Sequence, residues 1–196
     1  GIRPLGAASR WWLHHSLAAL ETDLGARGAR LVIRRGPSLE ALQATVVECG
    51  ADALYWNRLY EPALTARDQQ IKQQLRAAGI EASSFKAHLL FEPWEVATGA
   101  GDPYRVFTPF WRNARARLDV GSPAPAPAAI ASAPVRGGLP LDELELLPRV
   151  AWDAGFHARW TPGEAGARDL LEAFIEGALE HYASGRDLPD RAGTSR

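Results

Sequence analysis

Three short apolar segments alternate with amphipathic helices in the first half of the sequence, and this alternation restricts the fold more than any other feature. The segments cover residues 29–34, 53–57 and 80–85, and turn residues or helices bound each of them. Strands separated by helices of this length need crossover connections, which produce parallel pairing and right-handed βαβ units. We therefore predict an α/β fold with a Rossmann-like (flavodoxin-like) parallel sheet and helices on both faces.

Parallel sheets of this kind bind ligands beyond the carboxyl ends of their strands, which here are residues 57–61 and 86–88. No glycine fingerprint for a dinucleotide follows any predicted strand, and no phosphate-binding loop with Gly-Lys-Ser or Gly-Lys-Thr occurs. A simple NAD-dependent or ATP-dependent enzyme is therefore disfavoured. We also predict no metal site.

Residues 92–113 hold an unusual concentration of large aromatic side chains among prolines and glycines. The aromatic residues are Trp94, Tyr104, Phe107, Phe110 and Trp111. Solvated loops seldom carry so many of them, so we expect a packed corner that holds a loop against the sheet. Thr108-Pro109 is typical of a helix N-terminus and predicts a helix that runs toward residue 118.

Prolines and alanines dominate the stretch that follows this helix. Prolines recur throughout residues 121–150 and prevent a continuous helix or strand there. Beyond this stretch an amphipathic pattern returns, with apolar residues from Leu170 to Tyr182. We predict an α/β domain over residues 1–120, an interdomain linker over residues 121–150, and the beginning of an all-helical domain over residues 151–196.

The charge balance, the cysteine content and the lengths of the apolar runs argue against a strongly basic nucleic-acid binder, a disulfide-rich protein and a membrane-spanning protein. Lys and Arg number 22 against 23 Asp and Glu, so any contact with nucleic acid must be local. The single cysteine, Cys49, cannot form a disulfide within the chain, and no apolar run reaches membrane-spanning length. We expect a soluble, cytoplasmic monomer that makes no membrane contact. Because methionine is absent, we expect the sequence to be a piece of a longer protein.

Several separated blocks of the sequence resemble the DNA photolyase and cryptochrome family. They are Ser9-Arg10-Trp11-Trp12, Trp56-Asn57-Arg58-Leu59-Tyr60-Glu61-Pro62, Arg67-Asp68, Pro103-Tyr104-Arg105-Val106-Phe107-Thr108-Pro109-Phe110, and parts of the tail from Trp160 to Arg196. The resemblance implies an α/β antenna domain, followed by a helical domain that binds FAD and admits a pyrimidine dimer flipped out of UV-damaged DNA. It implies a deoxyribodipyrimidine photo-lyase, of which this fragment alone is expected to be inactive.

The resemblance also implies roles for particular residues. Tyr182, Thr194, Ser195 and Arg196 look like FAD contacts, and Arg186 resembles an arginine that contacts the DNA backbone. The catalytic residues would lie beyond Arg196. Judged on residue chemistry alone, Tyr182 is an ordinary half-buried aromatic and Arg186-Asp187 a surface ion pair.

Two departures from the family pattern leave questions open. Pro62-Ala63-Leu64 stands where family members that bind folate in the enterobacterial manner carry an Asn-Glu pair. The antenna chromophore is therefore left open between folate, a deazaflavin and another group. The chain also begins after the family's first strands, so we expect an incomplete sheet. A cryptochrome-type photoreceptor is the alternative function, and a freestanding Rossmann-like nucleotide-binding module is the third.

Overall fold

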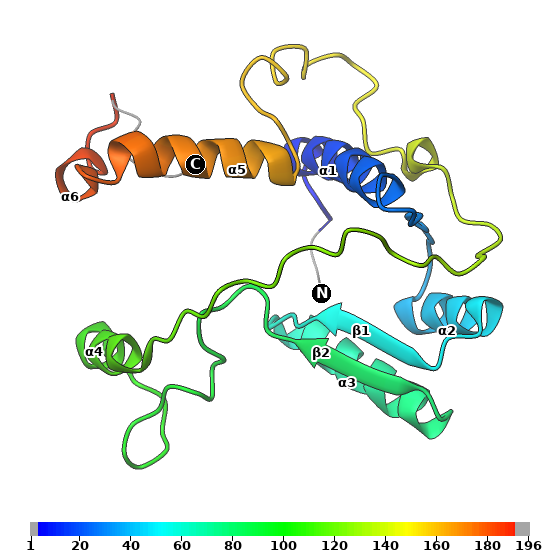
Figure 1. The fold of residues 1–196 in the computed structure, drawn as a ribbon, viewed down its shortest axis with the longest axis horizontal. Helices are drawn as coiled ribbons and strands as arrows, with labels where there is room; N and C mark the ends of the chain where they lie inside the picture. The colour runs from blue at the N-terminus through cyan, green and yellow to red at the C-terminus, as the bar shows by residue number, and fades with distance from the viewer. Residues whose placement is uncertain (1–3, 191–196) are drawn as a thin grey trace. The chain divides into compact units, whose positions relative to one another are not determined.

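The computed structural model describes residues 4–190 (Figure 1). In chain order its elements are α1 (Ala7–Gly25), α2 (Ser38–Cys49), β1 (Ala53–Asn57), α3 (Pro62–Ala77), β2 (Glu81–Phe85), α4 (Phe107–Arg117), η1 (Leu141–Leu144), α5 (Glu164–Ala173), η2 (Phe174–Ala178) and α6 (Tyr182–Gly185). The chain forms two compact units. Gly36–Ala126 is called the sheet unit below, and the described parts of Ile2–Arg35 and Pro127–Arg196 are called the helical unit.

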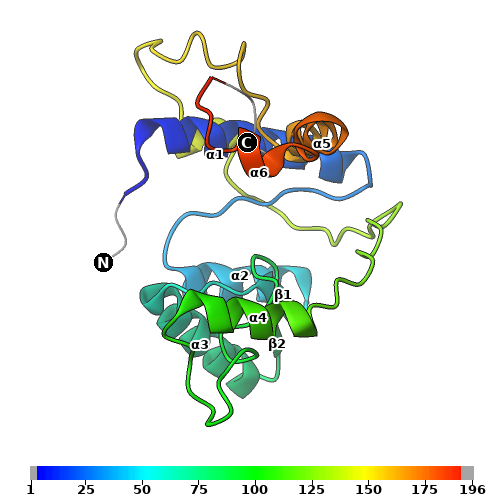
Figure 2. The same cartoon turned by 90° about the vertical axis from the view of Figure 1, so that its left-hand side faces the viewer.

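The sheet unit is built on two strands that pair in parallel, as the alternation predicts. Leu54 of β1 lies opposite Ala82 of β2. Residues of α2 and α3 pack against these strands, and the labels in Figures 1 and 2 locate all four elements. The buried centre consists of Ile71, Leu75 and Ala82, and the side chains packed against it are Leu39, Leu42, Leu54, Trp56 and Ile80. This confirms a mixed α/β fold with a small parallel sheet flanked by helices.

Two glycines with left-handed backbone end the helices that precede the strands. Gly50 follows α2 with φ 64°, and Gly79 follows α3 with φ 81°. Few other residues adopt this conformation without strain, and it turns the chain out of the helix axis. The Ala51 N–H then bonds to the Val46 carbonyl, and the Ile80 N–H bonds to the Leu75 carbonyl. Each glycine thus directs the chain from a helix into the following strand.

The prediction of a strand over residues 29–34 is wrong. This segment is extended but does not join the two-stranded sheet. Instead, the Ile33 carbonyl accepts the Leu139 N–H at 2.8 Å, and Arg30 donates to the Val135 carbonyl at 3.3 Å. A β-branched sequence needs a neighbouring strand to form a ladder, and among residues 4–190 the proline-rich segment is its partner.

The packed aromatic corner is confirmed only in part. Glu92 and Val96 are buried, and α4 forms close to the predicted position. Trp94, however, is 65% exposed, and Phe107 and Trp111 are exposed as well. The last two rings stack on each other along α4, with centroids 6.4 Å apart and planes 6° apart, instead of packing into a core. Aromatic residues at positions i and i+4 of a helix can stack on each other at the helix surface, without another element of structure packed over them.

Trp11 of α1 is the centre of the helical unit and is fully buried. Its ring lies 5.1 Å from the Phe156 ring, 4.5 Å from His15 and 5.0 Å from His157, measured between centroids. These contacts fix the turn-rich residues 151–160 against α1. Farther along, α5 runs directly into η2, a single π-helical turn. Within residues 4–190 no helix combines the length and the apolar character that crossing a membrane requires.

The histidines around Trp11 should make stability depend on pH. Burial lowers the pKa of His15 below 6.5, and the neighbouring His157 and His14 lower it further, whereas Asp153 opposes the shift. Below pH 6.5 the unfolded chain therefore binds more protons at this position than the folded chain does, and stability is lost as the pH falls toward the lowered pKa. We expect the midpoint of urea unfolding to fall between pH 7.5 and pH 5.5.

His15→Asn should flatten this pH dependence, because the substitution removes the group that titrates differently in the two states. The matched control is His88→Asn, at an exposed histidine of the sheet unit. An unchanged pH dependence in His15→Asn would contradict the assignment.

Candidate functional site

The structure brings together the two described members of the predicted FAD and DNA site. Tyr182 begins α6, and Arg186 follows its end, one helical turn later. The Arg186 guanidinium lies 5.7 Å from the centroid of the Tyr182 ring, and the Phe174 ring lies edge-on to Tyr182 with the two centroids 5.9 Å apart. Thr194, Ser195 and Arg196 lie outside the described residues.

Both side chains remain accessible to a ligand. Arg186 is 52% exposed, and its ion pair with Asp187 spans 3.6 Å between two exposed groups. Such a pair contributes little and yields readily to a phosphate, which offers the guanidinium two acceptor oxygens. The Tyr182 hydroxyl makes no hydrogen bond within the described chain and can donate to a cofactor.

A second candidate site lies in the sheet unit, where β1 ends. It is a cleft of about 380 Å³, called here the strand-end cleft, and it is lined by Arg58, Leu59, Tyr60, Thr65, Asp68, Gln69, Lys72, Ser84, Pro93 and Trp94. Arg58 follows β1 directly, and α3 supplies the polar residues from Thr65 to Lys72. The sequence predicts a ligand site in this place from the direction of the strands alone.

A buried carboxylate shapes the wall of the strand-end cleft. Glu92 is 5% exposed, and it accepts hydrogen bonds from the Arg58 guanidinium and from the Tyr60 hydroxyl, the latter at 2.9 Å. Arg58 also donates to the Ser84 carbonyl at 2.7 Å. Burial, together with the bond to Glu92, raises the pKa of Tyr60, so its hydroxyl stays a donor. The network holds the loop that carries Trp94.

Lys72 brings a second cation to the same cleft. Its ammonium donates to the Ser84 hydroxyl at 2.7 Å and lies 5.4 Å above the Trp56 ring. Burial lowers the pKa of Lys72, and the neighbouring Arg58 and Arg76 lower it further. The carboxylates of Asp68 and Glu92 balance these two cations, so the exposed Trp94 beside polar groups is what suits the cleft to a planar ligand.

Sequence reasoning located this cleft but missed most of its residues. Lys86 and His88 follow β2, yet neither lines the cleft; the Lys86 ammonium turns instead to the Glu95 carboxylate at 3.5 Å. Glu92 carried a signal, because it is the only charged residue in the apolar run of residues 89–94. The part of the chain described by the structure contains no group of three or more residues able to hold a metal ion.

The chain is similar to proteins of one family over nearly its whole length. The family model described as DNA photolyase matches residues 1–128. A deoxyribodipyrimidine photo-lyase from Agrobacterium fabrum is 44% identical over 98% of this chain and 40% of its own length. Cryptochrome-1 of Arabidopsis thaliana is 36% identical over 97% of this chain and 28% of its own length.

Solved structures agree with these sequence relationships. The crystal structure of a bacterial class III photolyase from Agrobacterium tumefaciens matches 100% of this chain and 41% of its own, with a TM-score of 0.93 and 43% identity. A Synechocystis cryptochrome at 20% identity shares the fold, with a TM-score of 0.78 over 92% of this chain and 38% of its own. The chain spans about 40% of the length of the photo-lyases that it matches. Because the family model covers well over half of its residues, this chain belongs to the DNA photolyase family.

Proposed function

We propose that this chain contributes the antenna domain, the linker and the first part of the FAD-binding domain to a deoxyribodipyrimidine photo-lyase. The observation that carries the proposal is the 44% identity to the Agrobacterium fabrum enzyme over 98% of the chain. The proposed division is an α/β domain over residues 1–120, a linker over 121–150 and a helical domain that begins at 151. Location in the cytoplasm and a monomeric state stay predictions.

The second candidate is a cryptochrome-type photoreceptor, which would signal without repairing DNA. It is supported by the 36% identity to cryptochrome-1 of Arabidopsis thaliana over 97% of the chain. The photo-lyase is favoured because its identity is higher over the same residues. A freestanding nucleotide-binding module is disfavoured, since the similarity continues through the linker into the C-terminal helices.

In the proposed site, FAD and DNA are bound by two neighbouring side chains, Tyr182 and Arg186. Tyr182 would donate a hydrogen bond to the cofactor, together with Thr194, Ser195 and Arg196, and Arg186 would bind a phosphate of the damaged strand. The accessible Tyr182 hydroxyl and the weakly paired Arg186 guanidinium fit these roles. When bound, reduced FAD would supply the light-excited electron that splits a cyclobutane pyrimidine dimer.

The strand-end cleft is the proposed place of the antenna chromophore. Its volume of about 380 Å³, its polar lining and the exposed Trp94 suit a planar chromophore such as a deazaflavin. A folate bound in the enterobacterial manner is disfavoured because Pro62 begins α3 and Leu64 follows on its first turn, where that mode needs an amide and a carboxylate.

A hybrid enzyme tests the repair function. Residues 1–196 replace the matching 40% of the Agrobacterium fabrum photo-lyase, and the hybrid is illuminated with an oligonucleotide that contains a cyclobutane dimer. We expect light-dependent loss of the dimer, because the hybrid keeps the proposed FAD contacts and the arginine proposed to bind DNA. A parallel hybrid built with the matching segment of Arabidopsis cryptochrome-1 is the control. A folded, FAD-loaded hybrid that repairs nothing would favour the photoreceptor.

Arg186→Ala in the hybrid should weaken binding to dimer-containing and undamaged DNA alike. One lost phosphate contact lowers the slope of log K against log salt by about 0.9, which titrations at several salt concentrations can measure. Arg168→Ala is the matched control, because Arg168 is an exposed arginine paired with Glu164 at 2.9 Å. A loss confined to damaged DNA would assign Arg186 to the dimer pocket instead.

The 196-residue chain alone should retain no FAD after dialysis against the cofactor. Tyr182 is the one predicted flavin contact among the described residues, and a single hydrogen bond contributes only about 1 kcal/mol. That amount cannot offset the lost freedom and desolvation of a dinucleotide. Flavin absorbance of the dialysed protein is the measurement. Stoichiometric FAD would contradict the assignment of the cofactor site to Tyr182 and the C-terminal residues.

A further inference from the structure

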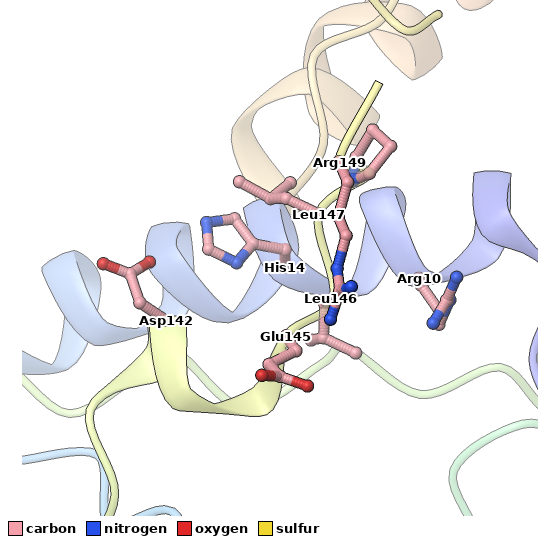
Figure 3. A pocket seen from close by; sticks show the side chains of 8 residues that line it. Arg10, His14, Asp142, Glu145, Leu146, Leu147 and Arg149 are labelled. Carbon is pink, nitrogen blue, oxygen red and sulfur yellow. The ribbon is translucent and has the colours of Figure 1, made fainter. Parts of the chain in front are cut away.

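The helical unit contains a cavity that neither Tyr182 nor Arg186 lines. Its volume is about 580 Å³, and its lining residues are Arg10, His14, Asp142, Glu145, Leu146, Leu147, Pro148 and Arg149 (Figure 3). α1 forms one wall, and the other consists of η1 with the residues that follow it. We call it the amphoteric cavity because it presents charges of both signs.

A buried imidazole in this cavity lacks a partner. His14 is 9% exposed, and its Nδ1 atom is buried without a hydrogen-bond partner among the described residues. A buried polar atom left unpaired costs free energy comparable to a lost hydrogen bond, so such atoms are rare in folded proteins. His14 lines the cavity, so a bound ligand would lie against a buried imidazole that the described chain leaves without a hydrogen-bond partner at Nδ1.

The charged groups of the cavity are also unpaired. Arg10, Asp142, Glu145 and Arg149 make no hydrogen bond or ion pair through their side chains within residues 4–190. In Figure 3, Asp142 lies on the His14 side and Arg10 on the opposite side, with Glu145 and Arg149 between them. In this view the cavity has Asp142 and the imidazole at one end, Arg10 at the other, and one group of each charge, Glu145 and Arg149, between them.

The backbone of Glu145, in the wall of the cavity, has an unusual conformation. Glu145 has φ 51°, and it is the one residue other than glycine with positive φ in the described chain. This conformation is strained for a residue with a side chain, and such strain concentrates at ligand sites. Glu145 follows η1 directly and leads into residues 146–149, which complete the wall of the cavity.

We infer that the amphoteric cavity binds a nucleoside monophosphate whose base carries an exocyclic amino group. The phosphate would bind to Arg10 and Arg149, whose planar guanidinium groups match its oxygens. The amino group would donate to the Asp142 carboxylate, as cytosine N4 does to acidic side chains, and the base would lie against Leu146 and Leu147. The base or sugar would lie against the His14 ring.

Two simpler occupants fit less well. An inorganic anion could pair with the arginines, but it would leave the Asp142 carboxylate without a hydrogen-bond donor. A metal ion would need a cluster of ligands, and no group of three or more candidate ligands occurs in residues 4–190. A ligand with an anionic group for the arginines and a hydrogen-bond donor for the Asp142 carboxylate can bind both kinds of charged group in the cavity.

Calorimetric titration of the 196-residue chain with CMP and UMP tests the inference. The two nucleotides share size and phosphate, but the amino donor of cytosine is a carbonyl acceptor in uracil. We expect CMP to bind at least about tenfold more tightly than UMP, because uracil would set an acceptor against a carboxylate. No binding of CMP up to about 5 mM, or equal binding of both nucleotides, would overturn the inference.

Two exposed side chains of the cavity allow matched variants that should not disturb folding. Arg149→Gln should weaken both nucleotides about tenfold, and Asp142→Asn should abolish the preference for CMP. Arg159→Gln and Glu172→Gln, at exposed positions of the helical unit outside the cavity, should change neither value. Inorganic phosphate that binds as tightly as CMP would reduce the cavity to an anion site and reject the proposal.

Discussion

The buried carboxylate of Glu92 is the interaction on which the ligand-facing part of the sheet unit depends. An ionised carboxylate costs several kcal/mol to bury unless charged and neutral donors surround it. Here Arg58 and Tyr60 both donate to it, and Arg58 in turn donates to the Ser84 carbonyl on β2. The loop after β2 is thereby tied to the end of β1. Loss of Glu92 would leave the Arg58 guanidinium without its counter-charge.

The same network extends into the loop itself. The Glu95 carboxylate accepts the Glu92 N–H at 2.7 Å, and this bond, with help from Lys86 and Arg117, holds the pKa of Glu95 below its usual range. Arg117, at the end of α4, donates to the Glu95 carbonyl at 2.7 Å. The position of α4 therefore follows from a chain of polar contacts that starts at Glu92. Trp94 lies in this loop with the Arg58 guanidinium over its ring, 5.3 Å from the centroid, and most of its side chain stays exposed.

The helical unit uses backbone hydrogen bonds where the sheet unit uses a buried charge. The proline-rich segment is bonded to residues 27–35 at several points: Ile130 donates to the Arg27 carbonyl, Leu139 to Ile33, and Arg35 to the carbonyls of Glu143 and Leu144. Proline removes donors from such a segment but leaves its carbonyls available, so arginine side chains become its natural partners. These bonds place η1 beside α1, and the amphoteric cavity is a consequence of that placement.

Sequence patterns predicted the helices and strands that depend on local periodicity. They failed for features that depend on contacts between residues far apart in the sequence. The strands β1 and β2, the helix α3 between them and the irregular proline-rich segment all follow from apolar spacing and turn residues. The segment of residues 29–34 has the composition of a strand, yet the pairing that makes a strand is a property of its neighbours. The exposure of Trp94 and the pairing of Arg58 with Glu92 likewise depend on which residues meet, and spacing does not encode that.

Burial distinguishes the arginines that hold the fold from those that can bind ligands. The Arg58 side chain is 28% exposed, and its guanidinium donates hydrogen bonds to Glu92 and Ser84. An incoming anion must therefore compete with bonds that stabilise the fold. Arg186 is 52% exposed, and its partner Asp187 is more exposed still, so a phosphate displaces a weak contact at little cost. In a chain with almost no net charge, affinity for a polyanion then depends on such weakly paired side chains and not on an overall field. The predicted DNA contact at Arg186 meets this condition, whereas Arg58 is committed to the wall of the strand-end cleft.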